Sequence, residues 1–267
     1  GIIAKGERLY AEVHTAEAER ELLKAQKTVE TLYSALSNTL GGDESTYIPA
    51  TSMFILNDIE SVSYFKDLAK QHSPLLKQVG YKKQLATENM RLQRADFAPQ
   101  VALTGMAAFY NYQVSPIIPK WAVGAGVSLK IFDGLNREYK FSAAKSQIRQ
   151  VEAVGHQAES DILTLIDKLY NEMVTYSQQL PSVNASGRFA EEYLRIKEEA
   201  FKEGAAPSSD VVDARLNLAK IRIERLQAAY YYDMMLARLL EACGQSELFP
   251  DYGKRAAAMP IRYEHDF

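Results

Sequence analysis

One helical periodicity extends over most of the interval from residue 134 to residue 203, and it strongly limits the possible folds. Apolar side chains there recur at spacings of three, four or seven residues, as on one face of a helix. At about 1.5 Å per residue, such a helix is roughly 100 Å long. A compact domain is narrower than that, so we expect partner helices along its length. The recurring residues are Ile148, Val151, Ala158, Ile162, Leu165, Leu169, Met173, Tyr176 and Leu180.

Two shorter runs have the same period and are the natural partners of the long helix. One covers residues 74–96, where Ser73 is expected to cap the helix and Pro74 to occupy its first position. The other covers residues 208–243. Pro181 lies inside the long run, and it either kinks that helix or divides it in two.

Between these runs the period changes to two, which predicts a β-hairpin over residues 99–133. In the second strand the odd positions from Trp121 to Ile131 are apolar, and the even positions are small or polar. The first strand alternates in the same way, though less cleanly, from residue 101 to residue 110. Strands of about ten residues with one apolar face are typical of a transmembrane hairpin.

Aromatic residues lie at one end of this hairpin, as in an interfacial girdle: Phe109, Tyr110, Tyr112 and Trp121. A soluble hairpin packed on the helices is the alternative interpretation. A lone hairpin is only marginally stable in water, and open strand edges are not tolerated in lipid. A membrane hairpin therefore predicts several copies of the chain that close one barrel.

An internal repeat relates the two ends of the chain. Residues 1–41 align without a gap on residues 204–244, at a constant offset of 203. Eight identities result, and a glycine stands at each end of both copies. A chance match of two Ala/Leu-rich helices is the alternative. Duplication predicts that the first repeat lacks the counterpart of residues 42–203, so that the chain is a fragment. The identical pairs begin at Gly1, Ala11, Ala16, Glu21, Leu23, Ala25, Leu36 and Gly41.

Composition argues against several classes of function. A net charge of −3 without a basic stripe argues against nucleic-acid binding. No run approaches the roughly 18 apolar residues of a membrane-spanning helix. The single cysteine, Cys243, is expected to be a small core residue. The four histidines are scattered, and no nucleophile elbow or phosphate loop occurs, so we expect no enzyme, no metal and no cofactor.

Four short passages, in this order, resemble the TolC-type outer-membrane efflux family. They are Ser-Pro-Leu-Leu-Lys at 73–77, Ala-Asp-Phe-Ala-Pro at 95–99, Val-Ser-Leu-Lys-Ile-Phe-Asp-Gly at 127–134, and Glu-Gly-Ala-Ala-Pro-Ser-Ser-Asp-Val-Val-Asp-Ala at 203–214. The two-repeat organisation of that family also accounts for the offset of 203.

The resemblance implies a mainly α fold: long antiparallel helices of an α-barrel, with one transmembrane-type β-hairpin. Three protomers would assemble, and each full protomer would give four strands to a twelve-stranded outer-membrane barrel. Residues 1–41 would be the last helix of the first repeat, 42–72 a connector and 73–244 the second repeat. Residues 245–267 would form a tail near the middle of the helical barrel.

The resemblance also implies where such a duct is gated. The turn after the long helix would be the periplasmic tip, which closes the duct and meets an adaptor protein; its residues are Gly204, Ala205, Ala206, Pro207 and Ser208, with Gly1 as the counterpart in the first repeat. Asp210 and Asp213, with Glu7 in the first repeat, would line the constriction. Phe201 and Ala206 occupy the places where some members have a tyrosine and an arginine that lock the tip. Asp210 also suits a helix N-terminus after Ser208 and Ser209.

Two functions follow from these features. The first is a passive export duct in the outer membrane, joined through a periplasmic adaptor to an inner-membrane pump of the RND or ABC type. The second is a soluble periplasmic coiled-coil adaptor or structural protein. The outward face of residues 121–131 separates them, because an adaptor would cover that face with its own helices.

Overall fold

A computed structural model describes residues 2–41, 52–107 and 121–261. The chain is mainly α-helical, with long helices and one hairpin, as the sequence predicts. It divides into two compact units, which are described separately. The first unit contains residues 1–65, 166–241 and 245–267, and the second contains residues 66–165 and 242–244. In the described ranges, no helix combines the length and the apolarity that a membrane crossing requires.

The long helix α4, Asn136–Lys202, contributes to both units and is continuous over 67 residues. Pro181 lies inside it, so the helix is not divided there. The proline is exposed, whereas Leu180 beside it is almost fully buried. Packing of α4 through Leu180 and Ala190 accounts for the tolerance of one missing backbone donor.

In the second unit, α3 (Pro74–Ala95) runs antiparallel to α4. Asn89 donates to Gln147 at 3.2 Å, and Lys83 lies 3.0 Å from Glu152. Small residues allow the two helices to approach closely, because a Cβ on Gly155 would lie 3.3 Å from a methyl group of Val79. Most apolar residues buried in this unit are also small, for example Ala86, Ala144 and Ala158, and Ile162 is the large exception.

The start of α3 corrects one expectation. Pro74 is at the first position, as predicted, but the side chain of Ser73 makes no capping hydrogen bond. Ser73 is buried, and its hydroxyl has no partner among the described residues. The fixed φ of proline favours the helix start without that bond.

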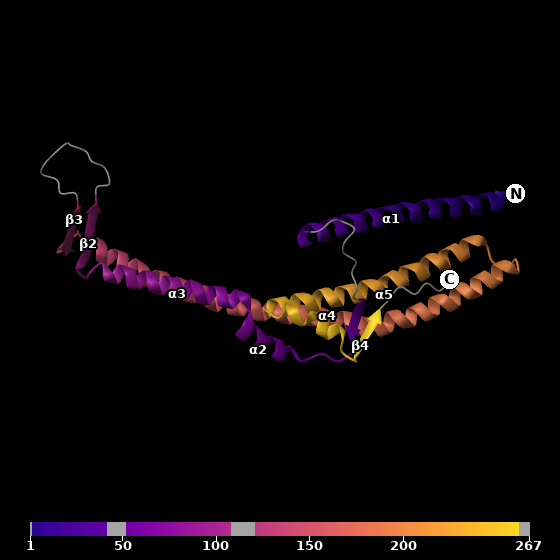
Figure 1. Cartoon of the computed structure of the whole chain (residues 1–267). Coiled ribbons are helices and arrows are strands. Elements are labelled where there is room, and N and C mark those ends of the chain that lie inside the picture. The colour runs from indigo at the N-terminus through magenta and orange to yellow at the C-terminus, as the bar shows by residue number, and fades with distance from the viewer. Residues whose placement is uncertain (1, 42–51, 108–120, 262–267) are drawn as a thin grey trace, which may run out of the picture. The chain divides into compact units, whose positions relative to one another are not determined.

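The hairpin consists of β2 (Gln100–Ala107) and β3 (Trp121–Ser128), paired antiparallel (Figure 1). The register places Val101 opposite Val127 and Ala107 opposite Trp121, so most large apolar residues of both strands share one face. The other face carries mainly small and polar residues, for example Thr104 opposite Gly124, together with Met106. Nearly every residue of both strands is exposed.

In the first unit, α5 (Ser208–Ala242) returns antiparallel along α4. The rings of Tyr176 and Tyr231 stack with centroids 5.3 Å apart. The interior of this unit contains Met173 from α4 and Leu236 and Leu239 from α5, all fully buried. Burial of one such side chain stabilises a fold by roughly 1.5–3 kcal/mol.

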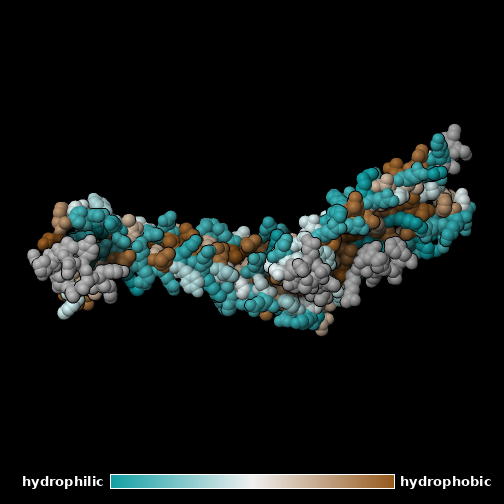
Figure 2. All heavy atoms as spheres, turned by 45° about the horizontal axis from the view of Figure 1, so that its top comes forward, coloured by the Kyte–Doolittle hydropathy of each residue, from teal (hydrophilic) through white to brown (hydrophobic). Residues whose placement is uncertain are grey.

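Helix α1 (Ile2–Leu40) also belongs to this unit, but it is far more exposed than α5. Both helices end at a glycine with positive φ, 74° at Gly41 and 69° at Gly244, which are partners in the 203-residue offset. This left-handed conformation stops a helix. Hydrophobic residues, brown in Figure 2, lie between hydrophilic residues along the helical surfaces.

A small sheet joins two segments that are distant in sequence. β1 (Met53–Leu56) pairs antiparallel with β4 (Ala258–Ile261). The chain continues from β1 into α2 (Val62–His72), and it reaches β4 through a short 3₁₀ turn, η1 (Ser246–Leu248), and α6 (Phe249–Gly253).

Candidate functional site

The turn between α4 and α5 closes in a geometry that requires glycine. Gly204 has a φ of 75°, and the N–H groups of Ala205 and Ala206 donate to the carbonyl of Ala200 at 2.8 and 3.2 Å. The bond from Ala205 to the fifth residue back, with Gly204 in the left-handed region, is the Schellman ending of a helix. Most of the turn from Glu203 to Pro207 is exposed.

Ion pairs connect the two helices beyond this turn. The Nζ of Lys197 lies 2.6 Å from a carboxylate oxygen of Asp210. Arg215 and Glu198 follow at 2.7 Å. The hydrogen bond to Asp210 raises the pKa of Lys197. Ion pairs so near to solvent contribute little to stability, so these pairs mainly fix the alignment of α5 along α4.

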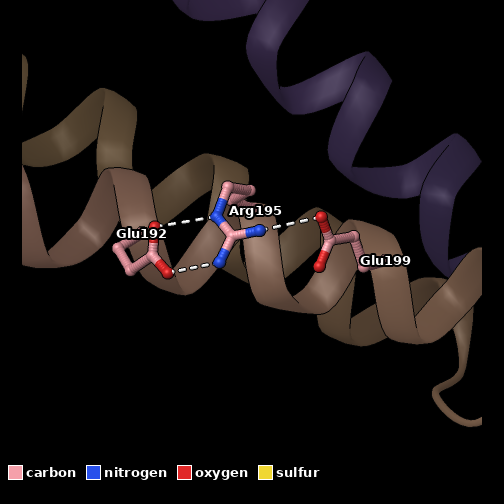
Figure 3. Close-up of polar contacts among 3 residues, drawn as sticks. All are labelled: Glu192, Arg195 and Glu199. Carbon is pink, nitrogen blue, oxygen red and sulfur yellow. Dashed lines mark hydrogen bonds and ion pairs between the residues drawn. The ribbon is translucent and has the colours of Figure 1, made fainter.

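A second charged group lies on the surface of α4. Arg195 donates to Glu192 through Nε and Nη2, at 2.8 and 2.5 Å, and to Glu199 through Nη1 at 2.8 Å (Figure 3). The hydrogen bonds from Arg195 lower the pKa of Glu192. The hydrogen bonds that Arg195 donates to Glu192, with the charges of both carboxylates, raise the pKa of Arg195. Arg195 and Glu192 therefore both remain charged across the physiological pH range.

Helix α1 contacts the start of α5 through two polar pairs. The hydroxyl of Tyr10 donates to Asp213 at 2.6 Å, and the hydroxyl of Ser208 donates to Glu7 at 3.3 Å. The bond to Asp213 raises the pKa of the Tyr10 phenol. Ser208 is thus directed toward α1, while Asp210 lies in the first turn of α5, where an acidic residue favours the helix dipole.

Each carboxylate predicted for the constriction therefore has a partner: Glu7 has Ser208, Asp210 has Lys197, and Asp213 has Tyr10. Lys197 and Tyr10 are not among the residues predicted from the sequence for the constriction. Tyr10 could have been found, because it is the repeat counterpart of Asp213 at the offset of 203.

A groove of about 870 Å³ lies beside these pairs, bordered by α1, α4 and α5. Its lining combines apolar and ionisable residues. The apolar residues are Ala11, Ala18, Leu194, Val212, Leu216, Leu218, Ala219 and Ile223, and the ionisable residues are His14, Glu191, Arg195, Glu198, Arg215 and Arg222. Such a surface suits a helix or peptide better than a reacting small molecule.

Of the other predicted site residues, the structure describes Trp121, which begins β3 and is exposed. Gly1, Phe109, Tyr110 and Tyr112 lie outside the described residues. Within the described ranges no group of three or more His, Cys, Asp or Glu side chains is arranged to hold a metal ion. Cys243 is fully buried, as expected of a core residue.

Comparison with known proteins agrees with this architecture. The family described as outer membrane efflux protein matches residues 66–245, which is two thirds of the chain. No curated protein sequence matches significantly.

Three solved structures illustrate the likeness in fold. The outer membrane protein VceC from Vibrio cholerae is 18% identical with a TM-score of 0.69, and the match covers 90% of this chain and 58% of VceC. The open MtrE channel of Neisseria gonorrhoeae is 19% identical with a TM-score of 0.72, over 88% of this chain and 54% of MtrE. A membrane protein from Pseudomonas aeruginosa is 20% identical with a TM-score of 0.66, over 87% and 55%.

This chain therefore spans little more than half the length of these proteins. Its fold is that of the outer-membrane efflux α-barrel channels. The family match over residues 66–245 and the fold agree, so the chain belongs to the outer membrane efflux protein family.

Proposed function

We propose that the chain is part of a passive export duct whose strands cross the outer membrane and whose helices continue the passage into the periplasm. The family is one of outer-membrane proteins of Gram-negative bacteria, with the helical part in the periplasm. The observation that supports the duct is the β2–β3 hairpin. Its apolar face, which includes Val123 and Val127, is exposed instead of being covered by the helices.

An exposed apolar face on two strands is unfavourable in water and favourable in lipid. A membrane excludes open strand edges, so two strands cannot remain alone there. We therefore propose that three copies of the full protein associate and close one barrel. The exposure of this face also argues against the soluble adaptor, which would cover it.

Extraction from membranes tests the duct. The full-length protein should sediment with outer membranes, resist high salt and alkaline washing, and become soluble only in detergent. Solubility without detergent would exclude the duct and favour the adaptor.

The start of α5 is the proposed gate. We propose that Asp210, Asp213 and Glu7 line the closed tip, and that the bonds from Lys197 and Tyr10 hold it closed in place of the absent tyrosine and arginine. A ring of carboxylates attracts cations and repels anions. Opening would require the Tyr10–Asp213 bond between α1 and α5 to break.

Conductance in planar bilayers tests this gate. Tyr10→Phe in the full-length protein removes one bond and should increase the time spent open, whereas Asp210→Asn with Asp213→Asn should reduce the preference for cations. Glu247→Gln removes an exposed charge far along the chain from the tip and is the matched control. Unchanged conductance and selectivity in both tip variants would refute the gate but leave the duct intact.

The exposed turn Gly204–Ser208 is the proposed contact for a periplasmic adaptor, which would link the duct to an inner-membrane pump. Exposure of most of its residues leaves it accessible to a partner. Cysteine crosslinking from Ala205 tests this: a crosslink to an adaptor at the turn, and none from Ser160 in the middle of α4, is the expected result.

The repeat implies a further helix in the full protein. Tyr232, Met235 and Leu236 of α5 are buried, whereas their counterparts on α1, Val29, Leu32 and Tyr33, are 50%, 63% and 37% exposed. An apolar face that is buried in one repeat and exposed in the other lacks its partner. We propose that a helix equivalent to α4 covers α1 in the full protein.

A further inference from the structure

The β1–β4 sheet is attached to α5 at a buried carboxyl group. The N–H of Phe54 in β1 donates to Oδ2 of Asp233 in α5, at 3.2 Å. Phe54 lies opposite Pro260 of β4, which has no N–H to donate. The donor of Phe54 is directed toward the helix, so Asp233 satisfies one backbone group on the free edge of β1.

Strand β1 packs against α5 and α6 through aromatic side chains. The ring of Phe54 lies 5.6 Å from that of Phe249 and 6.5 Å from that of Tyr232, between centroids. A Cβ on Gly253 would come within 3.0 Å of the Phe54 ring. Phe54, Ile55 and Leu56 are almost fully buried, so the edge bond to Asp233 lies where water is largely excluded.

The second carboxyl oxygen of Asp233, Oδ1, is buried and has no hydrogen-bond donor among the described residues. β1 presents no titratable side chain to Asp233. On α5, Tyr232 is adjacent, and Tyr230, Arg238 and Glu241 line the same cleft of about 550 Å³. Of the described tail residues, Ser246 and Phe249 line that cleft. In the described part of the chain no cation is bonded to Asp233.

Burial without a counter-charge disfavours the ionised form. It raises the pKa of Asp233 to about 7, although the Phe54 N–H acts in the opposite direction. Asp233 therefore gains or loses its proton near neutrality.

A second contact of the same sheet depends on pH in the opposite sense. Arg255, before β4, donates to both carboxylate oxygens of Glu60, after β1, at 2.7 and 3.1 Å, and stacks over Tyr252. Burial alone would raise the pKa of Glu60, but the hydrogen bonds and the charge of Arg255 outweigh burial and lower it. This ion pair persists until the solution is quite acidic.

We propose that the β1–β4 sheet is fastened to α5 by a proton-sensitive contact, which holds while Asp233 is protonated and loosens when Asp233 ionises. An ionised carboxylate with one bare, buried oxygen is unfavourable unless water reaches it, and water reaches it when β1 separates from α5. The Glu60–Arg255 pair keeps the two strands connected during this opening. The contact is therefore tightest in mildly acidic solution, above the titration of Glu60 and below that of Asp233. This proposal does not depend on the duct.

Hydrogen exchange of the 267-residue chain tests the contact. Peptides that contain Phe54 are followed at pH 6 and pH 8 by mass spectrometry, with rates corrected for the intrinsic dependence of exchange on pH. Protection in the wild-type chain should fall about 10-fold at pH 8, one unit above the titration of Asp233. Peptides from the middle of α4 report any general loss of structure.

Asp233→Asn keeps an acceptor for the Phe54 N–H and cannot ionise, so its protection should be the same at both pH values. Asp58→Asn, an exposed aspartate beside β1, is the matched control and should behave like the wild type. Carbon-13 NMR of aspartate-labelled wild-type chain needs no variant and should show one carboxyl titrating near pH 7. Equal pH dependence in the wild type and Asp233→Asn, or no carboxyl titrating above pH 6, would overturn the proposal.

Discussion

Replacement of Gly244 by alanine should destabilise the chain far more than the same change at Gly41. Both glycines end a helix with nearly equal positive φ, 69° and 74°. An alanine in the left-handed region costs about 1–2 kcal/mol. At Gly41 no atom of the described residues lies within 4 Å of the added Cβ, so the backbone cost is the whole effect.

At Gly244 the added Cβ would lie 2.4 Å from the carbonyl oxygen of His72 and 3.0 Å from Cδ of Pro74. The first contact is with backbone, which cannot rotate away as a flexible side chain would. Forced overpacking of this kind costs a further ~1–3 kcal/mol. Gly244→Ala should therefore lower the free energy of unfolding by about 2–5 kcal/mol in total.

Urea unfolding followed by circular dichroism measures both variants. The midpoint should fall well below that of the wild type for Gly244→Ala and only slightly for Gly41→Ala, with similar slopes. Gly204→Ala is a second control, because its Cβ also meets nothing within 4 Å at a φ of 75°. Three equal destabilisations would show that close packing at the α2–α3 junction does not distinguish Gly244.

Three other changes test separate parts of the structure. Leu135 has a φ of 67°, so Leu135→Gly should raise the free energy of unfolding by up to about 1 kcal/mol, whereas Leu135→Ala, which keeps the strain, should not. Leu236→Ala should cost about 2–5 kcal/mol because Leu236 is fully buried, and Tyr33→Ala, at its exposed repeat counterpart, should cost less than about 1 kcal/mol; equal costs would contradict the assigned burial. The raised pKa of Asp233 means that the folded chain binds the proton more tightly than the unfolded chain, so this group lowers stability as pH rises from about 4 to about 7. Between pH 6 and pH 8 the loss should be at most about 1.4 kcal/mol, which corresponds to the 10-fold fall in protection, and it should be absent from unfolding curves of Asp233→Asn.

The helices and the hairpin could be predicted because their signals are local and repeated. The run expected at 134–203 is observed at Asn136–Lys202, and the run expected at 208–243 at Ser208–Ala242. Alternation within each strand predicted the shared apolar face that the register confirms. The sequence could not show whether Pro181 kinks the helix or divides it. The helix is continuous because residues on both sides of Pro181 are buried, and that burial depends on tertiary contacts.

The small sheet and the pairs at the tip could not be predicted in the same way. β1 and β4 have four residues each and lie about 200 positions apart, so neither contains enough alternation to identify a strand or its partner. In the sequence Asp233 looks like an ordinary polar residue of an amphipathic helix. Its role depends on the contact with Phe54, which is distant in sequence. The constriction carboxylates were predicted from resemblance, and their role in gating stays a prediction.

The most direct test of the duct is whether the two faces of β3 contact different surroundings in the membrane. In the full-length protein, single cysteines at Val127 and Val123 mark the apolar face, and single cysteines at Ser128 and Ala122 mark the other face. The reaction of the buried native Cys243 gives the background. If the strand lines a membrane duct, Val127→Cys and Val123→Cys react with a lipid-soluble maleimide, and Ser128→Cys and Ala122→Cys react with a charged, water-soluble reagent. Equal reaction of all four with the charged reagent would contradict a lipid-facing strand and the duct with it.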